Sequence, residues 1–236
     1  MKHGFGTDHP WRRIAADATT ALLTIDYPAT HPVARLDRGI RLSQDAPRVD
    51  LSLTIHARRA TTLPVGLHPI LALPGATGAL RLRPAPHGRV RTAPAGLAPA
   101  TSRLVADQDI GADGLAICKD GSRLCLWDQP GPQSEELVLI RDCAGLLRAE
   151  NRAEGYALDL AWDAAALPHL LIWIANPGLA QDPRLPGFRG LGAEPVAAYF
   201  DSTPEGAAGV AITPGHPLTI RYAIECHKIT PEEVKT

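Results

Sequence analysis

Two ionisable residues stand in otherwise apolar segments, each directly before a proline: His68 in the segment PVGLHP and Glu194 in the segment GAEP. A residue before proline is held in extended backbone, so both should lie near strand ends. If their side chains face a common cleft, they can serve as proton donor and proton acceptor. Taken alone, His68 is more often a structural histidine, and Glu194 could equally be an exposed carboxylate on an edge strand.

The elements that must position this pair are predicted to be strands. In segment 49–56, Val49, Leu51, Leu53 and Ile55 alternate with polar residues, which indicates a half-buried strand. Similar segments are 79–83, 136–141, 156–162, 170–175, 196–200, 210–213 and 218–225. The 22 prolines and 21 glycines, spread along the chain, disfavour long helices. We predict an all-β fold, a sandwich of large antiparallel sheets forming a single domain over residues 1–236.

Two stretches are predicted to be loops. Residues 84–113 contain prolines that interrupt any continuous strand ladder, so we expect a long loop with short strands over one face. Residues 176–191 form a second predicted loop that leads to Glu194, and the glycine-rich part at 187–192 lacks the pattern of a phosphate-binding loop. Long loops beside a rigid sheet commonly shape a binding mouth.

Composition excludes several classes of partner. The formal net charge is −1 with no long basic run, so we predict no nucleic-acid partner. The start of the chain lacks the apolar core of a signal peptide, and no run of about 18 apolar residues follows, so we expect a cytoplasmic protein without a membrane partner. Neither the four cysteines nor the nine histidines have the spacing of a metal centre, so we expect no metal. The cysteines should be reduced and mostly structural.

Five local patterns occur in an order that is informative as a set. They are an opening His3-Gly-Phe followed by Trp11, the PVGLHP segment with His68, the LLIW strand with Trp173, the GAEP segment with Glu194, and a late Pro-Gly turn at Pro214-Gly215. In order and approximate spacing this resembles the aldose 1-epimerase (galactose mutarotase-like) family. No single pattern is specific, but the ordered set is much harder to dismiss.

The resemblance implies a β-supersandwich and an isomerase that interconverts the α and β anomers of a sugar without cofactor or metal. By this analogy Glu194 is the base that takes the proton of the anomeric hydroxyl, and His68 is the acid that protonates the ring oxygen. A nearby Glu194 anion would favour the protonated form of His68. His3 would hold the sugar near its ring oxygen. For the sugar-binding aspartate of the family we rank Asp128 first, with Asp142 and Glu135 as competitors.

The chain departs from the family at its start. Strands that usually precede the His-Gly segment, including an Asn-Arg element that contacts the sugar, have no counterpart here. We expect the missing strands to leave an exposed sheet edge, which a second copy in a homodimer could cover. Of the four tryptophans we expect at most one to face a sugar, and we expect Trp173 in the core.

Two alternatives remain open from the sequence. The substrate is either a free monosaccharide or a sugar phosphate, and a basic cluster around the cleft, for example Arg12, Arg13 or Arg189, would favour the phosphate. The second alternative is a non-catalytic carbohydrate-binding or sensing protein on the same fold, in which the cleft is kept without the activity.

Overall fold

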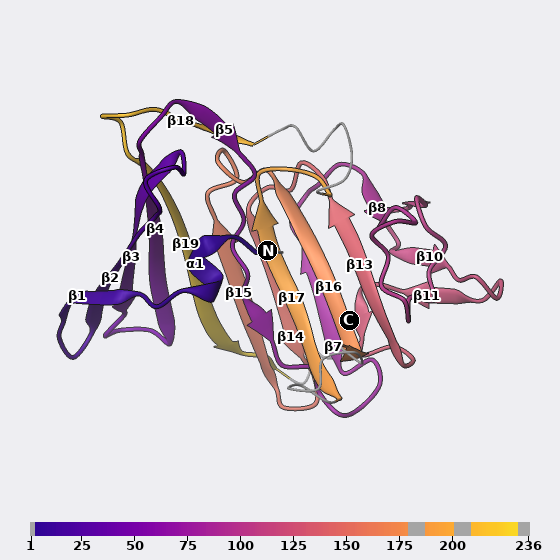
Figure 1. The fold of residues 1–236 in the computed structure, drawn as a ribbon. Coiled ribbons are helices and arrows are strands. Elements are labelled where there is room, and N and C mark those ends of the chain that lie inside the picture. Colours follow the sequence, from indigo (N-terminus) through magenta and orange to yellow (C-terminus); the bar gives the residue numbers. More distant parts are fainter. Residues whose placement is uncertain (1–2, 179–186, 201–208, 231–236) are drawn as a thin grey trace.

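The computed structural model describes residues 3–178, 187–200 and 209–230, and its strands form two large antiparallel sheets, one stacked on the other (Figure 1). The larger sheet has nine strands in the order β1-β2-β3-β4-β19-β15-β14-β7-β12. Their bounds are β1 (Arg12–Ala16), β2 (Thr20–Asp26), β3 (Val33–Leu42), β4 (Arg48–Ala57), β19 (Leu218–Lys228), β15 (Tyr156–Trp162), β14 (Leu146–Asn151), β7 (Leu80–Pro84) and β12 (Asp128–Gln129).

The smaller sheet has six strands in the order β6-β17-β16-β13-β8-β9, and its strands β17, β16 and β13 lie in front of β15, β14 and β7 in Figure 1. Their bounds are β6 (Ile70–Leu71), β17 (Phe188–Val196), β16 (His169–Gly178), β13 (Ser134–Ile140), β8 (Val90–Thr92) and β9 (Asp109–Ile110). Two further sheets each have two short antiparallel strands: β10 (Leu115–Ile117) with β11 (Arg123–Cys125), and β18 (Val210–Ile212) with β5 (Thr61–Leu63). One short helix, α1 (Phe5–Asp8), precedes β1.

The main hydrophobic core lies between the two sheets. Alternate residues of each strand face it, for example Leu82 and Leu147 from the nine-stranded sheet and Ile140 and Ile174 from the six-stranded sheet, each at most 2% exposed. Because strand side chains alternate between faces, the intervening residues lie on the two outer faces of the sandwich. The outer face of the six-stranded sheet carries the candidate site, and the outer face of the nine-stranded sheet carries mainly charged and small side chains.

The structure confirms the all-β prediction and most of the predicted strands. The alternating segment 49–56 lies in β4, and segment 156–162 coincides with β15. The predicted strand at 196–200 is wrong: β17 ends at Val196, and buried Phe200 packs with Leu139 on the outer face of the six-stranded sheet. The apolar segment 196–200 is buried because it packs against a sheet. Hydrophobic periodicity alone cannot distinguish such a buried segment from a strand.

The predicted loop at 176–191 is also wrong where the chain is described. Strand β16 continues to Gly178 and β17 begins at Phe188, so the glycine-rich segment 187–192 is almost entirely strand, while residues 179–186 lie outside the described part. The region 84–113 does contain only the short strands β8 and β9, as expected. None of the helices in the described residues is long and apolar enough to cross a membrane.

Strands β1, β2 and β3 were not predicted, because their residues are partly exposed on both faces and lack a clear alternation. Every residue of β1 is exposed, and this strand forms one edge of the nine-stranded sheet. That a second copy covers a sheet edge stays a prediction.

Candidate active site

The six-stranded sheet brings His68 and Glu194 together by strand register. Glu194 lies in β17, and the segment that carries His68 runs antiparallel beside it. A bridge joins Gly66 to Val196, so that two residues further along His68 lies opposite Glu194. Backbone hydrogen bonds of 2.9 and 3.0 Å flank this position and fix it. The Nε2 atom of His68 is 3.5 Å from Oε1 of Glu194, with the two side chains 35% and 10% exposed.

A glycine two residues before Glu194 makes room for its carboxylate. A Cβ atom on Gly192 would lie 2.5 Å from Oε1 of Glu194 and 3.2 Å from Cβ of Trp173. The Glu194 side chain therefore folds back over its own strand, beside Trp173, the strand neighbour of Gly192. A larger residue at position 192 would occupy the volume that the carboxylate uses, so this glycine belongs to the site although it carries no functional group.

Aromatic rings flank the pair on one side. The Trp173 ring meets the His68 ring edge-on, with centroids 6.3 Å apart, and stacks nearly parallel to Phe188, with centroids 5.6 Å apart. We expected Trp173 in the core, but its partner positions in β17 place it on the outer face of the sheet, half-buried. An aromatic surface next to an acid–base pair can pack against the apolar face of a sugar ring.

Burial shifts the two pKa values in opposite directions. Burial raises the pKa of Glu194 to about 7, because the charged carboxylate is the poorly solvated form. Burial also lowers the pKa of His68, and the neighbouring His3 lowers it further, because both disfavour the imidazolium. We expected the Glu194 anion to keep His68 protonated. The shifts instead favour neutral His68 and a proton on Glu194 below about pH 7.

His3, near the start of the chain, lies beside His68. The His3 ring lies 5.1 Å from the His68 ring, centroid to centroid, in an edge-on arrangement. The segment is anchored through α1, since the N–H of Gly6 donates to the hydroxyl of Tyr27 at 3.2 Å and the indole N–H of Trp11 donates to the Gly6 carbonyl at 2.8 Å. Figure 1 shows the described start of the chain beside β17. His3, His68 and Glu194 therefore form one cluster.

The structure does not bring Asp128 to this cluster. Asp128 lies in β12 of the other sheet, directly across from Arg81, which donates to it at 2.7 Å. Burial alone would raise the pKa of Asp128, but this hydrogen bond and the arginine charge lower it below its ordinary value. Leu80 and Leu82 point into the core, so Arg81 and Asp128 lie on the outer face of the nine-stranded sheet, across the core from Glu194.

The competing carboxylates have different places. Glu135 accepts a hydrogen bond of 2.9 Å from the indole N–H of Trp173, which puts this carboxylate on the same face as the cluster. Asp142 lies near the far end of the same face, with its Oδ1 3.9 Å from Nδ1 of His169. Of the three carboxylates ranked from the sequence, Glu135 is the one joined to the cluster through a contacting side chain.

The three arginines considered as a phosphate-binding cluster lie elsewhere. Arg12 and Arg13 are exposed on β1, at the distant edge of the nine-stranded sheet. Arg189 donates to the side-chain oxygen of Asn176 at 3.0 Å and to the carbonyl of Pro74 at 3.1 Å. These contacts hold Arg189 at one end of β17, on the face opposite to Glu194.

The residues of the cluster suit proton transfer. It holds a carboxyl group with a pKa near 7, an imidazole 3.5 Å away and a second imidazole beside the first. Over residues 3–178, 187–200 and 209–230, no group of three or more histidine, cysteine, aspartate or glutamate side chains is arranged to hold a metal ion. The described arrangement therefore supplies acid–base groups rather than a metal-ligand set.

Neither a scan against known protein families nor a search of curated proteins finds a match to the sequence. The structure, in contrast, is similar to several solved structures. A candidate aldose 1-epimerase from Escherichia coli K12 matches with a TM-score of 0.68 at 16% identity, over 96% of this chain and 72% of that one. A galactose mutarotase related enzyme from Lactobacillus acidophilus matches with a TM-score of 0.61 at 14% identity, over 97% and 74%.

A third similar structure is the GalM/aldose epimerase homologue from C. elegans, with a TM-score of 0.63 at 12% identity over 93% of this chain and 69% of that one. At such identities the likeness shows the fold. The chain has the galactose mutarotase-like fold, a β-supersandwich of large antiparallel sheets, as the ordered sequence patterns predicted.

Proposed function

We propose that this protein is an isomerase that interconverts the α and β anomers of a free monosaccharide by acid–base ring opening, with Glu194 as base and His68 as acid. The observation that carries the proposal is the 3.5 Å approach of His68 Nε2 to Glu194 Oε1 on one open sheet face. The solved structures of the same fold, whose descriptions name aldose 1-epimerases and mutarotases, support this class of reaction.

The proposed reaction returns both groups to their starting state. Glu194 takes the proton of the anomeric hydroxyl while His68 gives a proton to the ring oxygen; the bond from C1 to the ring oxygen breaks, and a C1 carbonyl forms. Rotation about the bond between C1 and C2 turns the other carbonyl face to the ring hydroxyl. Ring closure then returns one proton to His68 and one from Glu194 to the new anomeric hydroxyl.

Substrate binding would draw on the flanking residues. His3 lies beside His68, where its imidazole can hydrogen-bond near the sugar ring oxygen. Glu135, held by the Trp173 indole, is our revised choice for a carboxylate that accepts hydrogen bonds from sugar hydroxyls. A free sugar is favoured over a sugar phosphate because Arg12, Arg13 and Arg189 do not gather at the cluster.

Anomer-resolved NMR on freshly dissolved α-glucose and α-galactose tests the proposal. The wild-type chain should speed mutarotation above the spontaneous rate, and Glu194→Gln and His68→Asn should each lower kcat/KM by at least about 100-fold. Matched controls are Glu154→Gln and His216→Asn, which change the same residue types at exposed turns away from the site. Unchanged mutarotation with wild type and with Glu194→Gln would remove the catalytic claim.

The alternative, a non-catalytic carbohydrate-binding or sensing protein, predicts a different result in the same samples. Calorimetry would then show sugar binding that depends on His3 and Trp173, while mutarotation stays at the spontaneous rate. The pKa shifts place the favoured proton on Glu194 rather than on His68, the reverse of the proposed base and acid, and this is the feature that gives the alternative weight.

A further inference from the structure

A groove of about 800 Å³ lies on the outer face of the nine-stranded sheet, where β1 to β4 bend away from β15 and β19. Its floor is formed by small side chains at directly paired or adjacent positions, namely Gly39, Ser52, Ala161 and Ala223. A Cβ atom on Gly39 would lie 2.7 Å from the Ser52 hydroxyl oxygen, so a larger residue there would have to displace this hydroxyl. The groove is large enough for a small organic ligand.

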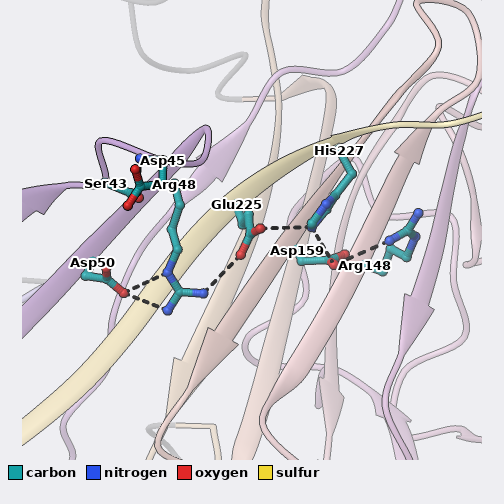
Figure 2. Close-up of polar contacts among 8 residues, drawn as sticks. All are labelled: Ser43, Asp45, Arg48, Asp50, Arg148, Asp159, Glu225 and His227. Atoms are coloured by element: carbon teal, nitrogen blue, oxygen red, sulfur yellow. Dashed lines mark hydrogen bonds and ion pairs between the residues drawn. The ribbon is translucent and has the colours of Figure 1, made fainter.

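The charged residues that line the groove fall into two groups. In the first, Arg48 is fully engaged: its Nε and Nη2 donate to Oδ1 of Asp50 at 2.9 and 2.6 Å, and its Nη1 donates to Glu225 at 3.0 Å. Figure 2 shows that this network continues from Glu225 through His227 to Asp159 and Arg148, so Arg48 is shared between the carboxylates of Asp50 and Glu225. Asp163, also in the lining, accepts the N–H of Ala165 in its own turn at 3.1 Å.

The second group consists of Arg41 and Arg221. Among the described residues, neither guanidinium has an ion pair or hydrogen bond with a side chain. They lie on the two strands that flank β4, with Arg41 across from Asp50 and Arg221 across from Ser52. Strand spacing puts their Cα atoms roughly 10–12 Å apart, so both side chains can reach a ligand over the Ser52 hydroxyl. The groove therefore has, above a small polar floor, two arginine side chains without a side-chain partner in the part of the chain that the structure describes, and its three arginines and two aspartates give the lining a formal net charge of +1.

One wall of the groove is apolar. Ala15, Ala21 and Leu22 from β1 and β2 line it, and Leu22 remains 40% exposed on this face. A ligand that satisfies both sides needs an anionic part for the arginines and an organic part for this wall. Guanidinium groups present a planar set of donors that matches the oxygens of a phosphate group, and two of them can hold a doubly charged anion.

We propose that this groove is a second binding site, for a small phosphorylated organic molecule, with Arg41 and Arg221 on the phosphate and Leu22 against the organic part. The site does not depend on the proposed isomerase activity, because the groove lies on the face of the sandwich opposite to His68 and Glu194. Its ligand can bind to a chain that has lost the acid–base pair, so the two proposals can fail separately.

Calorimetric titration of the full chain with pyrophosphate, at about 0.15 M salt, tests the charge requirement. We expect saturable binding with one site per chain, weakened at least about tenfold in Arg41→Gln and in Arg221→Gln. The matched control Arg123→Gln removes an exposed arginine on β11, outside the groove, and should bind as wild type does. Equal weakening in all three variants would show a general charge effect and overturn the proposal, as would the absence of saturable binding.

Two further arms test the groove itself and the ligand class. Gly39→Val keeps both arginines but fills the floor, so it should abolish pyrophosphate binding while circular dichroism shows an intact sheet; unchanged binding in the folded variant would overturn the groove as the site. Glucose 6-phosphate should bind more tightly than inorganic phosphate because Leu22 contacts its organic part. Tighter binding of succinate or of a short oligonucleotide than of any phosphate ester would instead assign the arginines to another ligand and refute the phosphorylated small molecule.

Discussion

A single methyl group at position 192 should displace the Glu194 carboxylate from the position proposed for catalysis without unfolding the protein. The Cβ atom of Gly192→Ala would start 2.5 Å from Oε1 of Glu194, whereas ordinary contacts begin at 3.4 Å, so the carboxylate oxygen must retreat by about 0.9 Å. The far end of a glutamate side chain moves easily by rotation about its bonds. The strain is therefore relieved by displacing the carboxylate, and the backbone at 192 is extended strand that accepts alanine.

A displacement of about 1 Å at a reacting group lowers rates roughly 100-fold, equivalent to about 2.7 kcal/mol of transition-state stabilisation. We expect Gly192→Ala to lower kcat/KM for anomer interconversion by that factor, measured by NMR, with a thermal midpoint close to that of wild type. The control Gly96→Ala places its Cβ atom in open space and should change neither quantity. Full activity in Gly192→Ala, alongside inactive Glu194→Gln, would refute the claim that the folded-back carboxylate conformation is the productive one.

Three other outcomes follow from the site. The pH profile of kcat/KM should be bell-shaped, because activity needs one proton shared by His68 and Glu194. The alkaline limb should fall near pH 7, where Glu194 loses its proton. The acid limb should lie below the ordinary pKa of histidine, where His68 is protonated and the pair carries two protons. A carboxyl group whose pKa is raised on folding stabilises the fold fully below its unfolded-state pKa, and this contribution is lost as pH rises through about 7. In urea titrations the unfolding free energy of Glu194→Gln should therefore gain up to about 3 kcal/mol relative to that of wild type between pH 4 and pH 8. A difference that does not change with pH would contradict the burial of Glu194. Trp173→Phe removes the donor to Glu135 and should raise KM several-fold with kcat retained, and an unchanged KM would argue against Glu135 as a binding group.

Much of the strand content was predictable because it follows from local alternation. Segment 49–56 lies in β4, whose core-facing residues Leu53 and Ile55 are buried, and the alternation shows this directly in the sequence. The first part of strand β17, up to Leu191, was predicted as a loop, and this error has a physical reason as well. Gly190 and Gly192 lower strand propensity, but they are present because Phe188, Trp173 and Glu194 need the space above them. At these two positions the site requires glycine for space, although glycine has a low propensity for strands.

The proximity of His68 and Glu194 was predictable, and the surroundings of the pair were not. His68 and Glu194 each stand before a proline in an apolar segment, which is a local signal. The place of Asp128 depends on which face of β12 it occupies, and two residues of strand give too little alternation to decide that. Glu135 and Trp173 became part of the site through pairing between β13 and β16, a contact between residues 38 positions apart that no local pattern encodes.

The pKa shifts of the pair fit a reaction that is its own reverse. Ordinary glutamate and histidine differ by about two pKa units, which fixes one as base and the other as acid. Here burial raises the pKa of Glu194 to about 7 and lowers that of His68, so the two approach and cross. In anomer interconversion, the group that accepts a proton during ring opening must donate a proton during ring closure, and the other group must do the reverse. A pair with the ordinary separation would favour one half of that cycle and slow the other, whereas the opposite shifts in this pair, 3.5 Å apart, work against that separation. If the shared burial is what shifts the two pKa values, exposing either residue should restore their ordinary separation, slow one half of the cycle and so lower the overall turnover.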